Sequence, residues 1–208
     1  MLRISLIGPG DIDFHYFQML KISREDFDMQ IGDIAEALKE SEIVLLPDKG
    51  VSFELARKYK ELGGKKVYAT MPLNDKDFGI MHLKPYIDSK VYDKNLFDEI
   101  INTDNWYKQD LKCAIYGDVV LMLGNSLGSI GELSNGFYLY RLFSKFKLDW
   151  KEIRAGTKVP FSVIIYQPFF KEKLNFEIEE YIKKSKGEIY YVSSAEEINK
   201  ILDKISLR

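Results

Sequence analysis

The sequence has few of the residues from which disulfide frameworks and metal centres are built. Its 208 residues include one cysteine, Cys113, and two histidines, His15 and His82. A single cysteine cannot form a disulfide within the chain, and it cannot supply a cysteine-based zinc cluster. Asp75 and Asp77 have no further ligands at a suitable spacing. We therefore expect no metal site.

An excess of positive charge and a long hydrophobic segment are also missing. Thirty lysines and arginines are balanced by 32 aspartates and glutamates, which gives a formal net charge of −2. Proteins that bind nucleic acids generally carry a basic surplus, so no nucleic-acid partner is expected. No apolar run approaches the roughly 18 residues that cross a bilayer. The apolar start breaks at Gly8-Pro9-Gly10, too early for a secretory signal. We expect a cytoplasmic protein with no membrane partner.

The composition that is present is typical of a folded globular protein. Hydrophobic residues make up 46% of the chain and charged residues 30%. This length supports one good core, and no internal repeat or linker interrupts it. We therefore predict a single domain that spans residues 1–208.

Short apolar runs alternate with amphipathic segments along nearly the whole chain. The pattern predicts strands over 4–7, 43–46, 67–71, 118–123, 161–166 and 189–192, and helices over 27–39, 52–62, 104–116, 130–146, 175–184 and from 195 onward. The segment 73–103 reads as a loop with short elements. Such alternation predicts an α/β, three-layer Rossmann-like fold, with helices on both faces of a mostly parallel sheet. Ligands of such folds bind at the carboxyl ends of the strands.

A turn of small residues follows the predicted strand 118–123 and leads into the next helix. Its residues include Gly124, Asn125, Ser126, Gly128 and Ser129. Small residues let the backbone approach a ligand, and the N–H groups and dipole of a helix start attract anions. The turn therefore predicts a site for a phosphate group.

The spacing of Ser129 and Glu132 allows a second interpretation of the same turn. A serine followed three residues later by a glutamate is the pattern of a capping box, in which both side chains satisfy backbone N–H groups at a helix start. Capping and ligand binding are compatible with each other, and both interpretations stay open.

The turn and the elements before it resemble the Lonely Guy (LOG) and molybdenum-cofactor-carrier-like family. The family motif is Pro-Gly-Gly-x-Gly-Thr-x-x-Glu, and Gly128, Ser129 and Glu132 match its second half. The first half is replaced by small residues at 124–126. Gly8, the segment 31–35 and Gly63-Gly64 follow the family order, so the resemblance covers roughly residues 1–145.

The resemblance implies a protein that binds a nucleotide or cofactor, with a phosphorylated ligand at the 124–132 turn, no further cofactor required, and a homodimer formed through helices. The alternative is an N-glycosidic hydrolase that releases the base from nucleoside 5′-monophosphates, with Glu132 as a catalytic residue. Whether the chain is an enzyme stays open. A third interpretation keeps the fold without any ligand.

Two departures from the family pattern define further candidate residues. The family's arginine–lysine pair falls on Gln109 and Asp110, so Lys108 and Lys112 become the candidate catalytic cations. Lysine lacks the planar fork of arginine, and the exchange is not conservative. The family's Gly-Gly-Gly turn is replaced by residues 47–50, where Lys49 is a candidate partner for the phosphate. Gly8, at the end of the first strand, completes the predicted site.

Overall fold

The computed structural model describes residues 1–146, 154 and 161–208. Within these residues, a seven-stranded parallel sheet has the order β6-β3-β2-β1-β7-β8-β9. Its strands are β1 (Arg3–Ile7), β2 (Glu42–Leu45), β3 (Lys66–Met71), β6 (Glu99–Asn102), β7 (Val119–Met122), β8 (Ser162–Tyr166) and β9 (Glu188–Val192).

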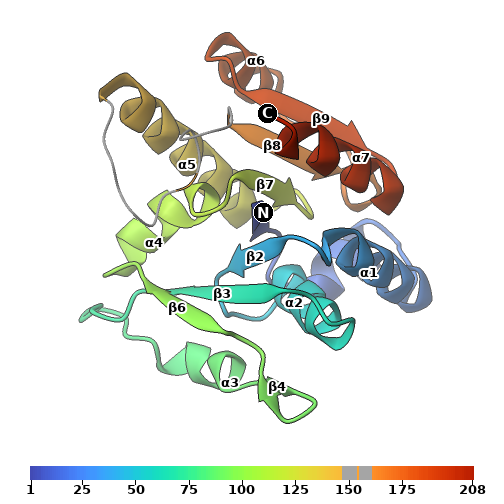
Figure 1. Cartoon of the computed structure of the whole chain (residues 1–208), viewed down its shortest axis with the longest axis vertical. Coiled ribbons are helices and arrows are strands. Elements are labelled where there is room, and N and C mark those ends of the chain that lie inside the picture. Colours follow the sequence, from blue (N-terminus) through green and yellow to red (C-terminus); the bar gives the residue numbers. More distant parts are fainter. Residues whose placement is uncertain (147–153, 155–160) are drawn as a thin grey trace.

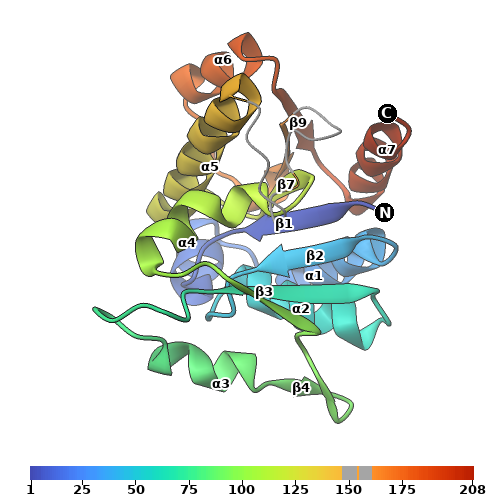
Figure 2. The same cartoon turned by 60° about the vertical axis from the view of Figure 1, so that its left-hand side comes forward.

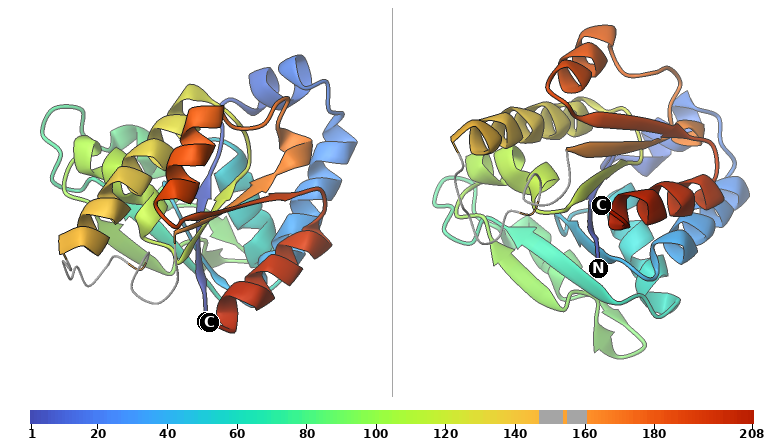
Figure 3. Two further views of the ribbon diagram at one scale, coloured as in Figure 1. Left: turned by 90° about the horizontal axis from the view of Figure 1, so that it is seen from above. Right: turned by 45° about the horizontal axis from the view of Figure 1, so that its top comes forward.

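Helices cover both faces of this sheet, which confirms the predicted fold class (Figures 1 and 3). One layer contains α1 (Arg24–Leu38), α2 (Val51–Glu61) and α7 (Ala195–Ser206). The other contains α4 (Trp106–Lys112), α5 (Leu127–Phe146) and α6 (Phe176–Lys184). No helix among the described residues combines the length and apolar character needed to cross a membrane.

The central strands are largely apolar because each is buried on both faces. Along β7, Val119 and Leu121 pack into the core under α1 and α2, whereas Val120 and Met122 pack into the core under α5 and α6. Alternate side chains of a strand point to opposite faces. A strand covered on both sides therefore reads as one continuous apolar run.

Two helix starts away from the switch point carry capping serines. Ser23 precedes α1, and its hydroxyl accepts the N–H of Asp26 at 3.0 Å. Ser194 precedes α7 in the same way, and its hydroxyl accepts the N–H of Glu197 at 3.3 Å. Such hydroxyls satisfy backbone donors that have no partner inside the helix.

The segment predicted as a loop, 73–103, contains more structure than its sequence suggests (Figure 2). It holds η2 (Met81–Leu83), α3 (Lys84–Ile87), the hairpin of β4 (Lys90–Val91) and β5 (Lys94–Asn95), and the edge strand β6. Of the four β6 residues, three are exposed and one is half-buried. An edge strand needs no continuous apolar run, so the pattern used for the inner strands does not reveal it.

Other boundaries also differ from the prediction. The helix expected over 104–116 is α4 followed by the 3₁₀ turn η3 (Cys113–Ile115). A π-helix, η1 (Asp13–Met19), follows β1 where no helix was predicted, and a short 3₁₀ helix, η4 (Gln167–Phe169), follows β8.

The order of the strands determines where a ligand can enter. From β1 the chain moves to β2 and β3 on one side, and later returns to place β7 on the other side of β1. The loops that leave β1 and β7 therefore run to opposite faces of the sheet. In open α/β sheets, this switch point opens a crevice at the carboxyl ends of the strands.

Candidate functional site

A small cavity of about 180 Å³ lies at this switch point, between the loops that follow β1, β2 and β7. The predicted site residues that line it are Gly8, Lys49, Ser126, Gly128, Ser129 and Glu132. We refer to this cavity as the cradle. Ser52 and Cys113 also line the cradle, although the sequence did not single out either as a site residue.

The start of α2 forms one side of the cradle. Gly50 precedes it with φ of 128°, and a Cβ there would lie 2.6 Å from the carbonyl oxygen of Pro9. Only glycine fits such a conformation and such a close approach. The Val51 N–H donates to the same Pro9 oxygen at 3.1 Å. The next amide, at Ser52, has no acceptor among the described residues. The Gly50 turn thus leaves this helix start without a side-chain cap.

The start of α5 forms the opposite side and corrects the expected capping box. The helix begins at Leu127, three residues before the predicted start. Ser126 and Ser129 cap it reciprocally: the Ser126 N–H donates to Ser129 Oγ at 2.8 Å, and the Ser129 N–H donates to Ser126 Oγ at 3.2 Å. The prediction that Ser129 pairs with Glu132 as the capping box is therefore wrong. In the described chain, the N–H groups of Leu127 and Gly128 have no acceptor.

One cation and two carboxyl groups complete the cradle. Lys49 is exposed and lines the opening from the loop after β2. Its neighbour Asp48 also lines the cavity, but one oxygen of that carboxylate accepts the backbone N–H of Lys49 at 2.7 Å. The second carboxyl group belongs to Glu132.

Glu132 projects from α5 toward the part of the chain between α4 and β7. Burial, together with the charge of Asp110, raises the pKa of Glu132 to about 7, and a hydrogen bond with the Cys113 thiol acts in the opposite direction. Burial also raises the pKa of Asp110. The pKa of the buried Cys113 thiol is raised well above its usual value, first by burial and then by the charges of Glu132 and Asp110. Near neutral pH, both the protonated and the ionised form of Glu132 are therefore populated.

The two lysines predicted as catalytic cations do not line the cradle. Lys108 forms an ion pair with Asp104 one turn earlier in the chain. Lys112, at the end of α4, lies close enough to Asp104 to lower the pKa of its carboxyl group. Between them Gln109 is buried, and its Nε2 donates to Thr70 Oγ1 at 2.8 Å. The chain thus brings Asp110, rather than a cation, close to Glu132.

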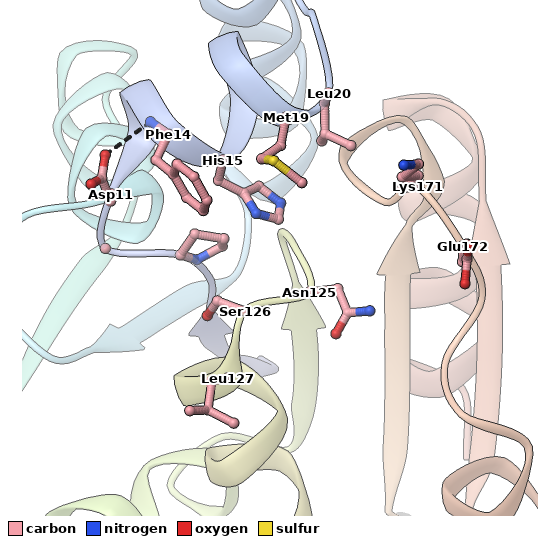
Figure 4. Close-up of a pocket in the computed structure, with 12 residues that line it drawn as sticks. Asp11, Phe14, His15, Met19, Leu20, Asn125, Ser126, Leu127, Lys171 and Glu172 are labelled. Carbon is pink, nitrogen blue, oxygen red and sulfur yellow. Dashed lines mark hydrogen bonds between the residues drawn. The ribbon is translucent and has the colours of Figure 1, made fainter.

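The remaining predicted residues, Gly124 and Asn125, lie beside a second and wider cavity of about 450 Å³ (Figure 4). Asn125 lines it directly. Gly124 lets η1 approach the β7–α5 turn, because a Cβ there would lie 2.6 Å from the Pro9 ring and 2.9 Å from His15 Nε2. Pro9, Gly10 and Ser126 line both cavities, so the wide cavity adjoins the cradle.

The described side chains offer no obvious metal centre. No three His, Cys, Asp or Glu residues in the described ranges are placed to hold a metal ion. The chemistry available at the cradle is instead that of backbone N–H donors, one lysine and a carboxyl group that titrates near pH 7.

Comparison with solved structures places this chain in a known fold. No family model and no curated protein matches the sequence. Among solved structures, the molybdenum cofactor binding protein from the phototrophic bacterium Rippkaea orientalis is similar, with a TM-score of 0.57 and 14% identity over 98% of this chain and 96% of that one. The molybdenum cofactor carrier protein of Chlamydomonas reinhardtii gives a TM-score of 0.58 and 14% identity over 99% and 98%. The chain therefore has the fold of the molybdenum cofactor carrier proteins, the fold that the motif resemblance predicted.

Proposed function

We propose that this protein binds a phosphorylated small molecule, a nucleotide or a cofactor, and holds its phosphate group in the cradle. The observation that carries the proposal is that two helix starts, those of α2 and α5, open on one cavity at the switch point of the sheet. Each start has at least one backbone N–H group without an acceptor in the described chain.

The physical basis is the attraction of an anion to helix N-termini. Unpaired N–H groups donate to phosphate oxygens, and the aligned peptide dipoles place a partial positive charge at each helix start. Lys49 adds a full positive charge at the opening. Two helix starts and one lysine together act against the negative charges of Asp48 and of ionised Glu132 in the same wall.

The structurally similar proteins support a cofactor as well as a nucleotide as the ligand. Both are described as molybdenum cofactor binding or carrier proteins. A phosphate monoester suits the N–H donors of the cradle. A nucleoside 5′-monophosphate presents the same group, so both ligand classes rest on the same feature.

Binding without turnover is the function that the cradle supports best. A glycosidic hydrolase of the alternative type needs a cation beside the glutamate, and Lys108 and Lys112 lie outside the cavity. The observation in favour of hydrolysis is Glu132, whose pKa of about 7 suits proton donation to a departing base. We retain hydrolysis as the second candidate on this ground.

Calorimetric titration with inorganic phosphate and ribose 5-phosphate tests the binding proposal. We expect saturable binding, and Lys49→Ala should weaken it about five- to tenfold, since an exposed charge-assisted contact contributes roughly 1 kcal/mol. Lys94→Ala is the matched control, because Lys94 is exposed on the distant β4–β5 hairpin. The absence of any binding, or equal losses in both variants, would contradict the proposal.

Chromatography for free base distinguishes binding from hydrolysis. The protein is incubated with nucleoside 5′-monophosphates, and we expect no release above the rate of a blank without protein. If base is released, the hydrolase function replaces the carrier function. Glu132→Gln should then abolish release, because it keeps the shape of the side chain and removes the titrating proton.

A homodimer remains part of the proposal. Tyr138 on α5 and Phe176 and Tyr181 on α6 expose half or more of their surface beside one groove of about 800 Å³. A second copy that covered this groove would bury these aromatic side chains. Sedimentation velocity tests it: a monomer at micromolar concentration would contradict the dimer.

A further inference from the structure

Helix α5 packs closely against the chain between α4 and β7, and two views show α4 beside it (Figures 1 and 2). Gly136 of α5 allows this approach, because a Cβ there would lie 2.4 Å from the Cβ of Ala114 in η3. Residues four positions apart share one face of a helix. Glu132, one turn before Gly136, therefore faces the same neighbours, and it lines the cradle together with Cys113 of η3.

Asp110, in the last turn of α4, brings a second carboxyl group to this contact. The Cys113 sulfur lies 3.6 Å from the backbone carbonyl oxygen of Asp110, and the thiol also forms a hydrogen bond with the Glu132 carboxyl group. The charge of Asp110 acts on both of these side chains. Helix α4 is itself held in place by buried Gln109, whose Nε2 donates to Thr70 of β3. The two carboxyl groups are thus fixed near each other by packing.

The other charged groups around the cradle do not balance these two carboxyl groups. From the loop after β2, Asp48 adds a third carboxylate, and Lys49 is the one lysine or arginine among the residues that line the cavity. Lys112, at the end of α4, lies outside the cavity and acts on Asp104. An anion that entered beside ionised Glu132 would therefore meet more negative than positive side-chain charge.

Protonation of Glu132 removes this excess of negative charge. A nearby like charge favours the neutral form of a carboxyl group, and a bound anion would act on Glu132 in the same direction as Asp110 does. The pKa of Glu132 is already about 7 without a ligand, first because of burial, so protonation near neutral pH needs little further free energy. A neutral carboxyl group also has an O–H donor, whereas an ionised one only accepts. Protonated Glu132 can therefore donate to the anion that ionised Glu132 repels.

We propose that Asp110 is a positioning residue that favours the protonated form of Glu132, and that the cradle takes up a proton together with a doubly charged anion. The proton replaces a fixed cation on this side of the cavity. The ligands that suit such a site are dianions, such as sulfate and the ionised form of a phosphate monoester. They should bind more weakly as the pH rises and Glu132 loses its proton. This inference rests on the proposed function.

Proton uptake during sulfate binding tests the inference directly. Sulfate carries no titrating proton near neutral pH, so calorimetry in buffers of different ionisation enthalpy counts the protons that the protein takes up. At pH 7.5 about one quarter of ligand-free Glu132 is protonated, and we expect an uptake of about 0.3–0.8 proton per sulfate bound. Glu132→Gln should take up none. Sulfate binding without proton uptake would overturn the inference and leave the cradle intact, whereas no sulfate binding at all would overturn the proposed function as well.

Two substitutions should move the midpoint of the pH dependence of sulfate affinity in opposite directions. Asp110→Asn removes the neighbouring charge and should shift the midpoint to lower pH by about half a unit. Cys113→Ala removes the hydrogen bond that stabilises ionised Glu132 and should shift it to higher pH. Asp28→Asn is the matched control, because Asp28 is exposed on α1, on the opposite face of the sheet, and should leave the midpoint unchanged. A midpoint that stays in place in Asp110→Asn, or that moves in the same direction in both variants, would show that Asp110 does not act through the proton of Glu132.

Discussion

The start of α4 and the starts of α2 and α5 all lie after strands of one sheet, yet they are satisfied in different ways. At α4, Asn105 Oδ1 accepts the N–H of Lys108 at 3.0 Å, and Asp75 Oδ2 accepts the N–H of Trp106 at 3.0 Å. The other oxygen of Asp75 accepts the N–H of Phe78 at 2.7 Å. The chain supplies its own carboxylate at this helix start.

At the starts of α2 and α5, no carboxylate plays this part. Gly50 has no side chain to offer, and the serine pair at α5 satisfies only its own two N–H groups. At the α4 start, by contrast, the N–H groups of Phe78 and Trp106 donate to the Asp75 carboxylate and lower the pKa of that carboxyl group. Under the proposed function, an external anion binds where the chain supplies no carboxylate to a helix start and leaves a cavity in front of it.

The largest effect is expected when the α5 start is made to resemble the α4 start. Ser126→Asp keeps a good capping residue and places a carboxylate in the cradle. The introduced carboxylate would repel a bound phosphate at a distance of about 4 Å in a partly buried site, which costs several kcal/mol. Phosphate affinity, measured by calorimetry, should therefore fall by roughly a hundredfold or more.

Ser126→Asn is the matched control for this substitution. Asparagine caps a helix about as well as aspartate but carries no charge. We expect it to retain phosphate binding within a few-fold. If Ser126→Asp and Ser126→Asn behave alike, the charge at this helix start does not determine binding.

A smaller but clear effect is expected on stability at the α2 start. Gly50→Ala forces a Cβ onto Pro9 and Gly10 in a conformation that side chains rarely adopt. It should lower the free energy of unfolding by about 1–3 kcal/mol, as measured by urea denaturation. Gly131→Ala, inside α5 with open space around it, should instead raise it by about 0.5–1 kcal/mol. If Gly50→Ala is as stable as the wild type, the claim that only glycine fits at position 50 is wrong.

The pH dependence of anion binding should reveal the ionisation of the Glu132 carboxyl group. Its pKa of about 7 means that the carboxyl group is neutral at pH 6 and ionised at pH 8. A negative charge in the cradle wall repels an anion, so sulfate, which keeps its charge across this range, should bind about three- to tenfold more weakly at pH 8. In Glu132→Gln the difference should disappear. A wild-type affinity that rises with pH would contradict this assignment.

The smallest effect on binding is expected at the α4 start. Asp75→Ala removes the acceptor of several backbone N–H groups and should lower the melting temperature. Phosphate affinity should stay within twofold, because Asp75 lies outside the cradle. A tenfold loss of phosphate binding in this variant would show that the two regions are coupled.

Much of the fold could be predicted from the sequence because its signals are local. The inner strands are continuous apolar runs, and glycine, proline and serine mark their ends. The edge strand β6 and the π-helix η1 could not be predicted, since an exposed edge has no burial pattern and η1 depends on tertiary contacts such as that of Tyr16 with Leu123.

The candidate site shows the same division between local and tertiary information. The motif identified Gly128, Ser129 and Glu132, all of which line the cradle. Ungapped spacing placed the family's cations on Gln109 and Asp110, so the nearby Lys108 and Lys112 became the candidates. Spacing alone could not show that these two lysines lie outside the cradle. Ser52 could have been found from its sequence, because it follows Gly50 at a helix start after a strand. The contact between Glu132 and Cys113 joins α5 to η3 and is visible only in the folded chain.

The most direct test of the central claim is to observe the backbone amides themselves. In a ¹⁵N-labelled sample titrated with inorganic phosphate, the amide signals of Ser52, Leu127 and Gly128 should shift most and saturate together. Largest shifts at Trp106 and Lys108, whose N–H groups already have acceptors, or no saturable shift anywhere, would contradict the account.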